Sequence, residues 1–303
     1  MDNLLLGGQV LCLSLVDCTL ASLCGLLLVG FWIGRSSAAM DGAANTFTFR
    51  PSLRWPALVL LLALSGQFWL LTMVMNGQSA PGVVLQSMPD VASTHAGRVI
   101  VWMLSLSVLL VAVTLRRLRG VATIAQNSAS AALIAAILFF HAGLGHAAAN
   151  GDFTRTELLQ FLHLMTMALW AGGVFVSAAV ALPILHGASG PAYATYLRRL
   201  SNTSAIAAST AILVGALKGW IAIDAKLGNL GQPGWSRILL AKSFFLCIAL
   251  ALGFFHRRKI HDRECQWSAI EKKTLVRTLR VEAFCLALVI FLSAWLSNAE
   301  PPG

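Results

Sequence analysis

Histidines are concentrated in one part of this sequence, within runs that are otherwise apolar. His141, His146 and His163 lie within 23 positions, in the stretch HAGLGHAAANGDFTRTELLQFLHLM at 141–165, although the 303-residue chain has only seven histidines. Neutral imidazole binds copper, zinc, iron and nickel, and the thioether of methionine favours Cu(I). These residue types therefore predict a site for a soft or borderline metal ion.

Methionines occur near these histidines. Met167 follows His163 by four residues, so the two share a face if the segment is helical. Met73 and Met75 close another apolar run earlier in the chain. The apolar runs carry no acidic pair beside the histidines, which argues against a site for a hard ion such as Ca²⁺. The combination favours copper, as Cu(I) or Cu(II).

The composition indicates an integral membrane protein. Charged residues make up 11% of the chain and hydrophobic residues 57%, with a mean hydropathy of +0.76, whereas soluble proteins average about 25% charged residues. A transmembrane helix needs about 20 mostly apolar residues. Eight runs qualify, roughly 9–33, 55–75, 97–115, 128–148, 157–185, 202–223, 237–256 and 279–298. We predict an all-α, polytopic protein whose eight transmembrane helices form a single transmembrane domain, 1–303.

Basic residues gather in alternate loops. Sixteen of the 22 Lys and Arg residues follow the first, third, fifth and seventh runs. Because cytoplasmic loops carry an excess of Lys and Arg, this pattern predicts that both termini lie outside. The net charge of +10 is then a topology signal and does not indicate nucleic-acid binding. The start, MDNLLLGG, is acidic where a signal peptide is basic, so we predict a retained first span.

This orientation brings four histidines to the outer membrane face. His141 and His146 end the fourth run, His163 begins the fifth, and His95 precedes the third. His141 and His146 are about 140° apart on an ideal helix, so they converge only if the intervening GLG bends or unwinds it; otherwise they serve different sites. The predicted metal ligands are His146, His163, His141 and His95, with Met167, Met73 and Met75.

Other polar residues lie inside the predicted spans. Asp17 is in the first, Lys218 in the sixth and Lys242 in the seventh. Ionisable residues within membrane helices pair with one another or mark an ion pathway. The simplest prediction is an ion pair between Asp17 and one of the lysines; the alternative is a proton or cation route below the histidines. Glu282, beside Arg280, is predicted to be an anchor at the inner surface.

Two further patterns concern the helices themselves. The small residues of WAGGVFVSAAVALP, 170–183, predict close helix packing, and Pro183 predicts a bend at the inner end of the fifth span. AGRVIVWM aligns with WSRILLAK, and FFHAGLGHA aligns with FLSAWLSNA. These alignments predict a parallel repeat of two four-helix halves, 1–150 and 151–303.

Several of these segments resemble the copper-resistance protein D (CopD) family. LHLMTMALWAGGVFVSAAVALP at 162–183 is similar to a His-then-Trp-Gly-Gly helix of that family, and GHAAA at 145–149 resembles the motif ending its preceding helix. WSRILLAKSFF, with its Arg-x4-Lys element, and the terminal Pro-Pro also match. The resemblance covers about residues 85–303.

The resemblance implies a bacterial inner-membrane protein that receives copper in the periplasm and moves it into the cytoplasm. It also implies a separate periplasmic copper carrier as partner. The family's histidine motifs carry over to His146 and His163, whereas His141 and His95 are added from their positions. A transporter or metal-binding protein is thus expected rather than an enzyme.

Two alternatives remain open. The same histidines could ligate haem b or a redox copper centre in a membrane oxidoreductase, because haem iron is held by histidines in many proteins. A sensor or assembly partner could also bind copper without moving it. The sequence has no HExxH, GxSxG or Walker motif, and its six cysteines include no CxxC pair, so none of these catalytic or disulfide classes is predicted.

Overall fold

The computed structural model describes residues 3–38, 52–77, 79–116, 124–144, 154–187, 190–224, 233–262 and 267–298. All regular structure in these residues is helical. The long helices are α1 (Asn3–Ala38), α2 (Arg54–Asn76), α4 (His95–Arg116), α5 (Ile124–Ala142), α6 (Arg155–Val176), α8 (Gly190–Asp224), α9 (Pro233–His261) and α10 (Ala269–Asn298). Eight helices of the described chain are long and apolar enough to cross a membrane, as predicted.

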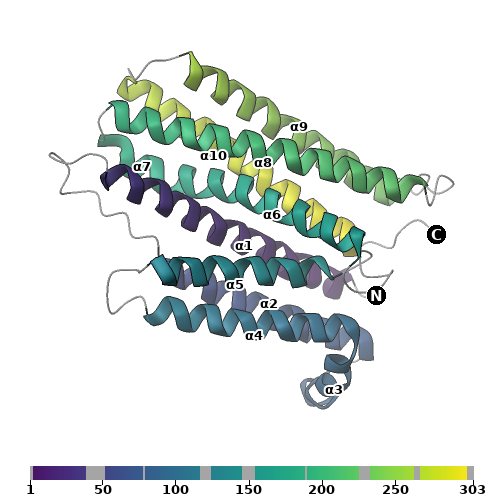
Figure 1. Cartoon of the computed structure of the whole chain (residues 1–303). Coiled ribbons are helices and arrows are strands. Elements are labelled where there is room, and N and C mark those ends of the chain that lie inside the picture. The colour runs from purple at the N-terminus through teal and green to yellow at the C-terminus, as the bar shows by residue number, and fades with distance from the viewer. Residues whose placement is uncertain are drawn as a thin grey trace.

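The helices form an antiparallel bundle in which α1 begins and α10 ends at the same end (Figure 1). We call this the terminal end. The opposite end holds the last turn of α4, the first turns of α8, the last turn of α9 and the start of α10, where arginine and lysine gather, and we call it the basic end. In Figure 1, α1 lies between α2, α4 and α5 on one side and α6, α8, α9 and α10 on the other.

A short helix, α3 (Pro81–Ser93), was not predicted. It connects α2 to α4 at the terminal end (Figure 1). Pro81 occupies its first turn, where a missing N–H costs nothing. The junction with α4 is tight, since a Cβ placed on Gly97 would lie 1.9 Å from the carbonyl oxygen of Val91.

The fourth span is shorter than predicted. The α-helical part of α5 ends at Ala142, and Gly143 and Leu144 close it with bonds to the carbonyl oxygens of Phe140 and His141, at 3.0 and 3.1 Å. Such i to i−3 bonds satisfy the orphaned carbonyls at a helix end. The helix thus stops where the GLG sequence begins, and His146 lies outside the described residues.

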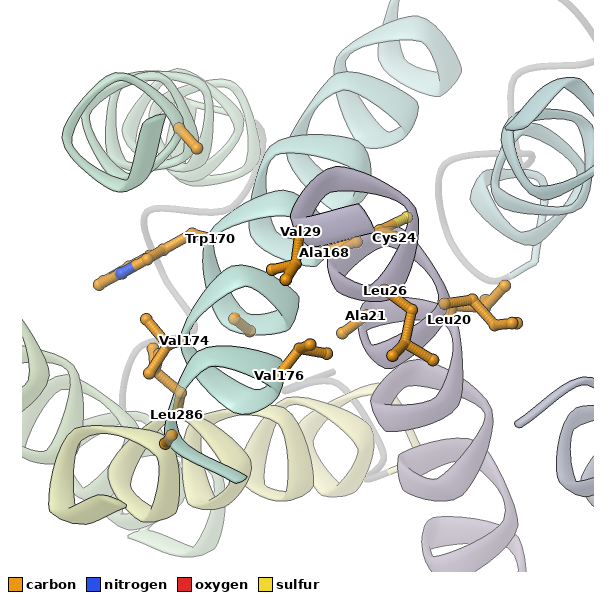
Figure 2. Close-up of a cluster of buried hydrophobic side chains, with 14 of the residues drawn as sticks. Leu20, Ala21, Cys24, Leu26, Val29, Ala168, Trp170, Val174, Val176 and Leu286 are labelled. Carbon is orange, nitrogen blue, oxygen red and sulfur yellow. The ribbon is translucent and has the colours of Figure 1, made fainter. Parts of the chain in front are cut away.

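The central contact of the bundle is a backbone contact between α1 and α6. A Cβ on Gly172 would lie 1.8 Å from the carbonyl oxygen of Ala21, and a Cβ on Gly25 would lie 2.0 Å from that of Gly172. Figure 2 shows Val29 and Val176 filling the space between the same two helices. The predicted role of the small-residue segment in close helix packing is therefore confirmed.

Beyond its contact with α1, the fifth span does not continue as a regular α-helix, and Pro183 lies in the irregular part. α6 passes into a π-helical turn, Ser177–Ala181, then a single α-turn, α7 (Leu182–Ile184), and a 3₁₀ turn, Leu185–Gly187. Proline has no N–H to donate to the preceding turn and its ring crowds that turn's carbonyl. The wider π-turn relieves this conflict, as π-bulges do elsewhere in helices.

The α1–α6 contact makes a testable prediction. Gly172→Ala places a methyl group inside the backbone of α1, so we expect the helices to separate and stability to fall by about 1–3 kcal/mol or more. Gly173→Ala is the matched control, because its Cβ would lie 3.6 Å from Leu200 Cδ1, an ordinary contact. Melting temperatures of the purified variants in detergent measure the difference, and equal values for both would contradict the proposed role of this contact.

Candidate metal site

The last turn of α5 meets the middle of α1 through a buried hydrogen bond. His141 Nε2 lies 2.7 Å from Asp17 Oδ1. Only 6% of the His141 side chain is exposed, and 20% of Asp17. The other ring nitrogen of His141, Nδ1, is buried and has no hydrogen-bond partner among the residues that the structure describes. A buried polar atom without a partner is unusual in folded proteins and calls for an explanation.

This geometry fixes the chemical state in which His141 can act. An ionised carboxylate only accepts hydrogen bonds, so Nε2 donates its proton to Asp17, and in the neutral imidazole Nδ1 then carries a lone pair. Histidines that ligate metals commonly donate their other N–H to a carboxylate, which fixes both ring orientation and tautomer. In this tautomer Nδ1 is the ring atom of His141 that could bind a ligand.

His163, eight residues into α6, is held in a similar way. Its Nδ1 donates to the carbonyl oxygen of Ala211 on α8, at 3.0 Å, which leaves the lone pair on Nε2. Gly215, one turn further along α8, provides the space, because a Cβ there would lie 3.2 Å from His163 Cε1. In the neutral ring of His163, Nε2 is therefore the atom with a free lone pair. The His163 side chain is partly exposed.

The intramembrane lysines gather around this histidine. Lys218 donates to Gln160 Oε1 of α6, and the ammonium groups of Lys218 and Lys242 both lie within electrostatic range of His163. Asp17 acts on Lys242 in turn, but its hydrogen bond goes to His141 instead of a lysine. The direct Asp17–lysine pair expected from the sequence is replaced by a wider polar network in the terminal half of the bundle.

Three of the other predicted ligands, His95, Met73 and Met75, lie near the terminal end, whereas Met167 lies deeper, twelve residues into α6. His95 is the first residue of α4 and is half-buried. Met167 packs against the hydrophobic core, Met73 is half-buried, and Met75 is 50% exposed at the end of α2. Among the residues that the structure describes, no group of three His, Cys, Asp or Glu side chains is placed to hold a metal ion.

A pocket opens at the terminal end between α5 and the start of α6. It is lined by Phe139, Thr154, Arg155, Glu157 and Leu158. Thr154 caps α6 by accepting from the Glu157 backbone N–H, and the buried Glu157 carboxylate points at Gly143, where a Cβ would lie 3.0 Å from its Oε1. Through Glu157, this pocket adjoins the turn that follows His141.

A second histidine–carboxylate pair was missed in the sequence. His256 of α9 lies 2.9 Å from Glu282 Oε2 through Nδ1, and both side chains are buried. The prediction that Glu282 anchors the inner surface is wrong, because this residue is 2% exposed and faces α9. The sequence contained a sign of this pair, because a histidine and a glutamate occur in the last two spans, which are adjacent and antiparallel.

Comparison with known protein families assigns both halves of the chain. Residues 1–156 match the family model described as the copper resistance protein D-like N-terminal domain, and residues 194–296 match that of copper resistance protein D. The chain belongs to the copper resistance protein D family. The match from residue 1 extends the resemblance over the first two spans, whose sequences carry little that is diagnostic.

One curated relative gives further information. Copper transport protein CutJ from Bacillus subtilis (strain 168) is 28% identical over 171 residues, which are 55% of this chain and 29% of that protein. The chain therefore covers less than a third of the relative's length. No solved structure matches this chain.

The His141–Asp17 hydrogen bond makes a prediction about stability. Asp17→Ala leaves both nitrogens of a buried imidazole without partners, and we expect a loss of about 1–3 kcal/mol. Asp17→Asn keeps an oxygen that accepts from Nε2 and should lose less. Melting temperatures in detergent measure both, with Asp90→Ala on the exposed face of α3 as control. A loss for Asp17→Ala no larger than for Asp90→Ala would contradict this role.

Proposed function

We propose that this protein binds copper at the terminal end of the bundle and moves it across the membrane toward the basic end. The observation that carries the proposal is the buried, unpartnered Nδ1 of His141, whose Nε2 is fixed by Asp17. An imidazole held in this way is suited to a borderline metal ion. Membership of a copper-resistance family supports copper as that ion.

The proposed ligands are neutral. His141 contributes Nδ1 and His163 contributes Nε2, and the family resemblance adds His146, with His95, Met167, Met73 and Met75 as further predicted ligands. Imidazole and thioether groups suit copper and bring no charge of their own. The negative charge of Asp17 lies one hydrogen bond away from the ion, where it offsets the lysines. This arrangement favours an ion that is bound and then released.

The proposed orientation follows from the basic end. Cytoplasmic loops are rich in Lys and Arg, so the basic end faces the cytoplasm of a bacterial inner membrane and both termini face the periplasm. Copper then enters from the periplasm, where a separate copper carrier would deliver it. The name of the Bacillus relative, a copper transport protein, supports transport over sensing. The division into half-repeats 1–150 and 151–303 remains a prediction.

Copper content per chain tests the site. After copper loading and desalting, elemental analysis should give one copper per wild-type chain and almost none in His141→Ala/His163→Ala or His146→Ala/His163→Ala. His261→Ala, an exposed histidine of the basic end, is the matched control and should keep its copper. Equal copper in folded wild type and both double variants would contradict the site.

Copper uptake tests the movement. Sealed vesicles containing the wild-type protein should accumulate copper, and vesicles containing the folded His141→Ala/His163→Ala variant should not, because entry requires the terminal-end ligands. Uptake is measured as copper retained after washing with an impermeant chelator. Copper that binds to the protein but never enters the vesicle would show a binding protein instead of a transporter.

A further inference from the structure

The histidine–carboxylate pair of α9 and α10 lies outside the proposed copper site. His256 is five residues from the end of α9, at the basic end of the bundle, whereas His141 closes α5 at the terminal end. The His256 and Glu282 side chains are 6% and 3% exposed. His256 Nε2 also lies 2.8 Å from the Thr278 hydroxyl, so both of its ring nitrogens are engaged. It has no lone pair ready for a metal ion.

In the arrangement in which Thr278 donates to its own helix, the hydrogen bonds of this group hold an extra proton. Thr278 Oγ1 is within 3.1 Å of the carbonyl oxygens of Thr274 and Leu275, to which it donates, so it accepts from His256 Nε2. The 2.9 Å contact of Nδ1 with Glu282 then needs a second proton, on either the imidazole or the carboxyl group. In both arrangements the pair carries no net charge.

Removal of that proton is costly in this environment. A neutral imidazole has a single N–H, so it keeps both contacts only if the Thr278 hydroxyl turns away from its own helix. Even then the buried pair retains an uncompensated negative charge, which a low-dielectric interior disfavours. In the described part of the chain, His256 is the basic side chain paired with Glu282.

Few other ionisable groups face the pair from α10 and α9. Cys285, one turn beyond Glu282, lies within its electrostatic range. Arg280 reaches instead to the carbonyl oxygen of Ala178, at 3.5 Å. Arg257 turns toward α8, where it donates to Asn202 Oδ1 at 3.0 Å. Each of these basic groups is thus engaged away from the carboxylate.

The neighbouring elements add little charge. The π-turn 177–181, SAAVA, has no ionisable residue, and α6 carries Arg155, Glu157 and His163 at its other end. The facing halves of α1 and α8 contribute Cys24, the neutral Tyr196, which bonds to the Ser177 hydroxyl, and Arg199, which donates to the Trp32 carbonyl oxygen at 2.8 Å. The charge state of the pair is therefore set by its own proton.

The pair also has a mechanical role, because it is a buried polar contact between α9 and α10. In the part of α9 whose side chains are described, 236–261, the buried residues are Ala249, His256 and Ile260. Gly253 lets the helices approach, since a Cβ there would lie 3.3 Å from Glu282 Oε1. Regions with few fully buried side chains open more easily than the core of a protein, and His256 is one of the few fully buried side chains by which α9 contacts α10.

We infer that His256 and Glu282 form a proton-binding site that latches α9 to α10: the bound proton holds the basic end closed, and its loss lets α9 move away. With respect to copper this rests on the proposed function, in which the basic end is the exit side and a cation arriving there displaces the proton into the adjacent water. Only an N–H or O–H bond breaks, and no electron is transferred.

Cys285 is a built-in reporter of this latch. It is 4% exposed, next to Glu282, whereas Cys247 on the same α9 is exposed. Labelling with N-ethylmaleimide, followed by peptide mass spectrometry, gives the Cys285:Cys247 ratio, which corrects for the general rise in thiol reactivity with pH. We expect this ratio to rise about tenfold or more from mildly acidic to alkaline pH. Loss of a hydrogen bond to a charged group shifts the equilibrium between the closed and open positions of α9 by about that factor.

Two variants identify the proton. In Glu282→Gln the side-chain amide N–H can donate to the lone pair on Nδ1 of the neutral imidazole. This contact needs no extra proton, so the ratio should stay low at every pH. Asp262→Asn removes an exposed carboxylate at the same end and should behave as wild type. A ratio independent of pH in wild type, or a wild-type rise retained in Glu282→Gln, would overturn the inference.

A third pair of variants covers the case in which Glu282→Gln does not fold. Thr278→Val removes the acceptor of Nε2–H, so the proton binds less tightly and the ratio should rise at lower pH than in wild type. Thr278→Ser restores the acceptor and the wild-type midpoint. An unshifted midpoint in Thr278→Val would contradict the latch. None of these measurements uses copper, so their outcome is independent of the copper-binding and uptake experiments.

Discussion

The backbone contact between α1 and α6 determines how the polar groups of these two helices lie relative to each other. Gly25 and Gly172 let the two helices touch main chain to main chain, and this fixes their relative register as well as their distance. α1 carries Asp17 and α6 carries His163, so the register also sets the depth of both groups. A larger residue at the contact would change the packing and the electrostatics together.

The polar network above this contact balances charges that would each be unfavourable alone. Asp17 binds His141 directly and acts on Lys242, while Lys242 and Lys218 act on His163. Two ammonium groups beside an imidazole oppose the arrival of a metal cation, because like charges repel strongly in a medium of low dielectric constant. Asp17 offsets this repulsion. A copper ion at His141 would therefore use the carboxylate twice, to orient the ligand and to reduce the local positive charge.

The sequence predicted the eight spans, the alternate basic loops and the close packing of the small-residue segment. The first two depend on composition alone, and small residues allow close packing whichever helix lies next to them. It did not predict the partner of Asp17. A carboxylate inside a membrane is expected to pair with a cation. The two lysines within the predicted spans were more obvious counter-ions than a histidine at the end of a helix. The partner depended on where α5 ends and which part of α1 its last turn meets, and neither can be read from composition. Glu282 was misplaced because its proximity to Arg280 in the sequence suggested a surface position.

The two histidine–carboxylate pairs differ in one respect that separates their chemistry. At His141 the carboxylate engages Nε2 and no described residue engages Nδ1, so the neutral ring keeps a lone pair inside the protein. At His256 the carboxylate engages Nδ1 and the Thr278 hydroxyl engages Nε2. A metal ion needs the lone pair that His141 keeps, whereas a proton fills the contact that His256 makes. In the proposed function and the further inference, the same residue types therefore serve copper at one end of the bundle and a proton at the other, and the hydroxyl group of Thr278 is one difference between them.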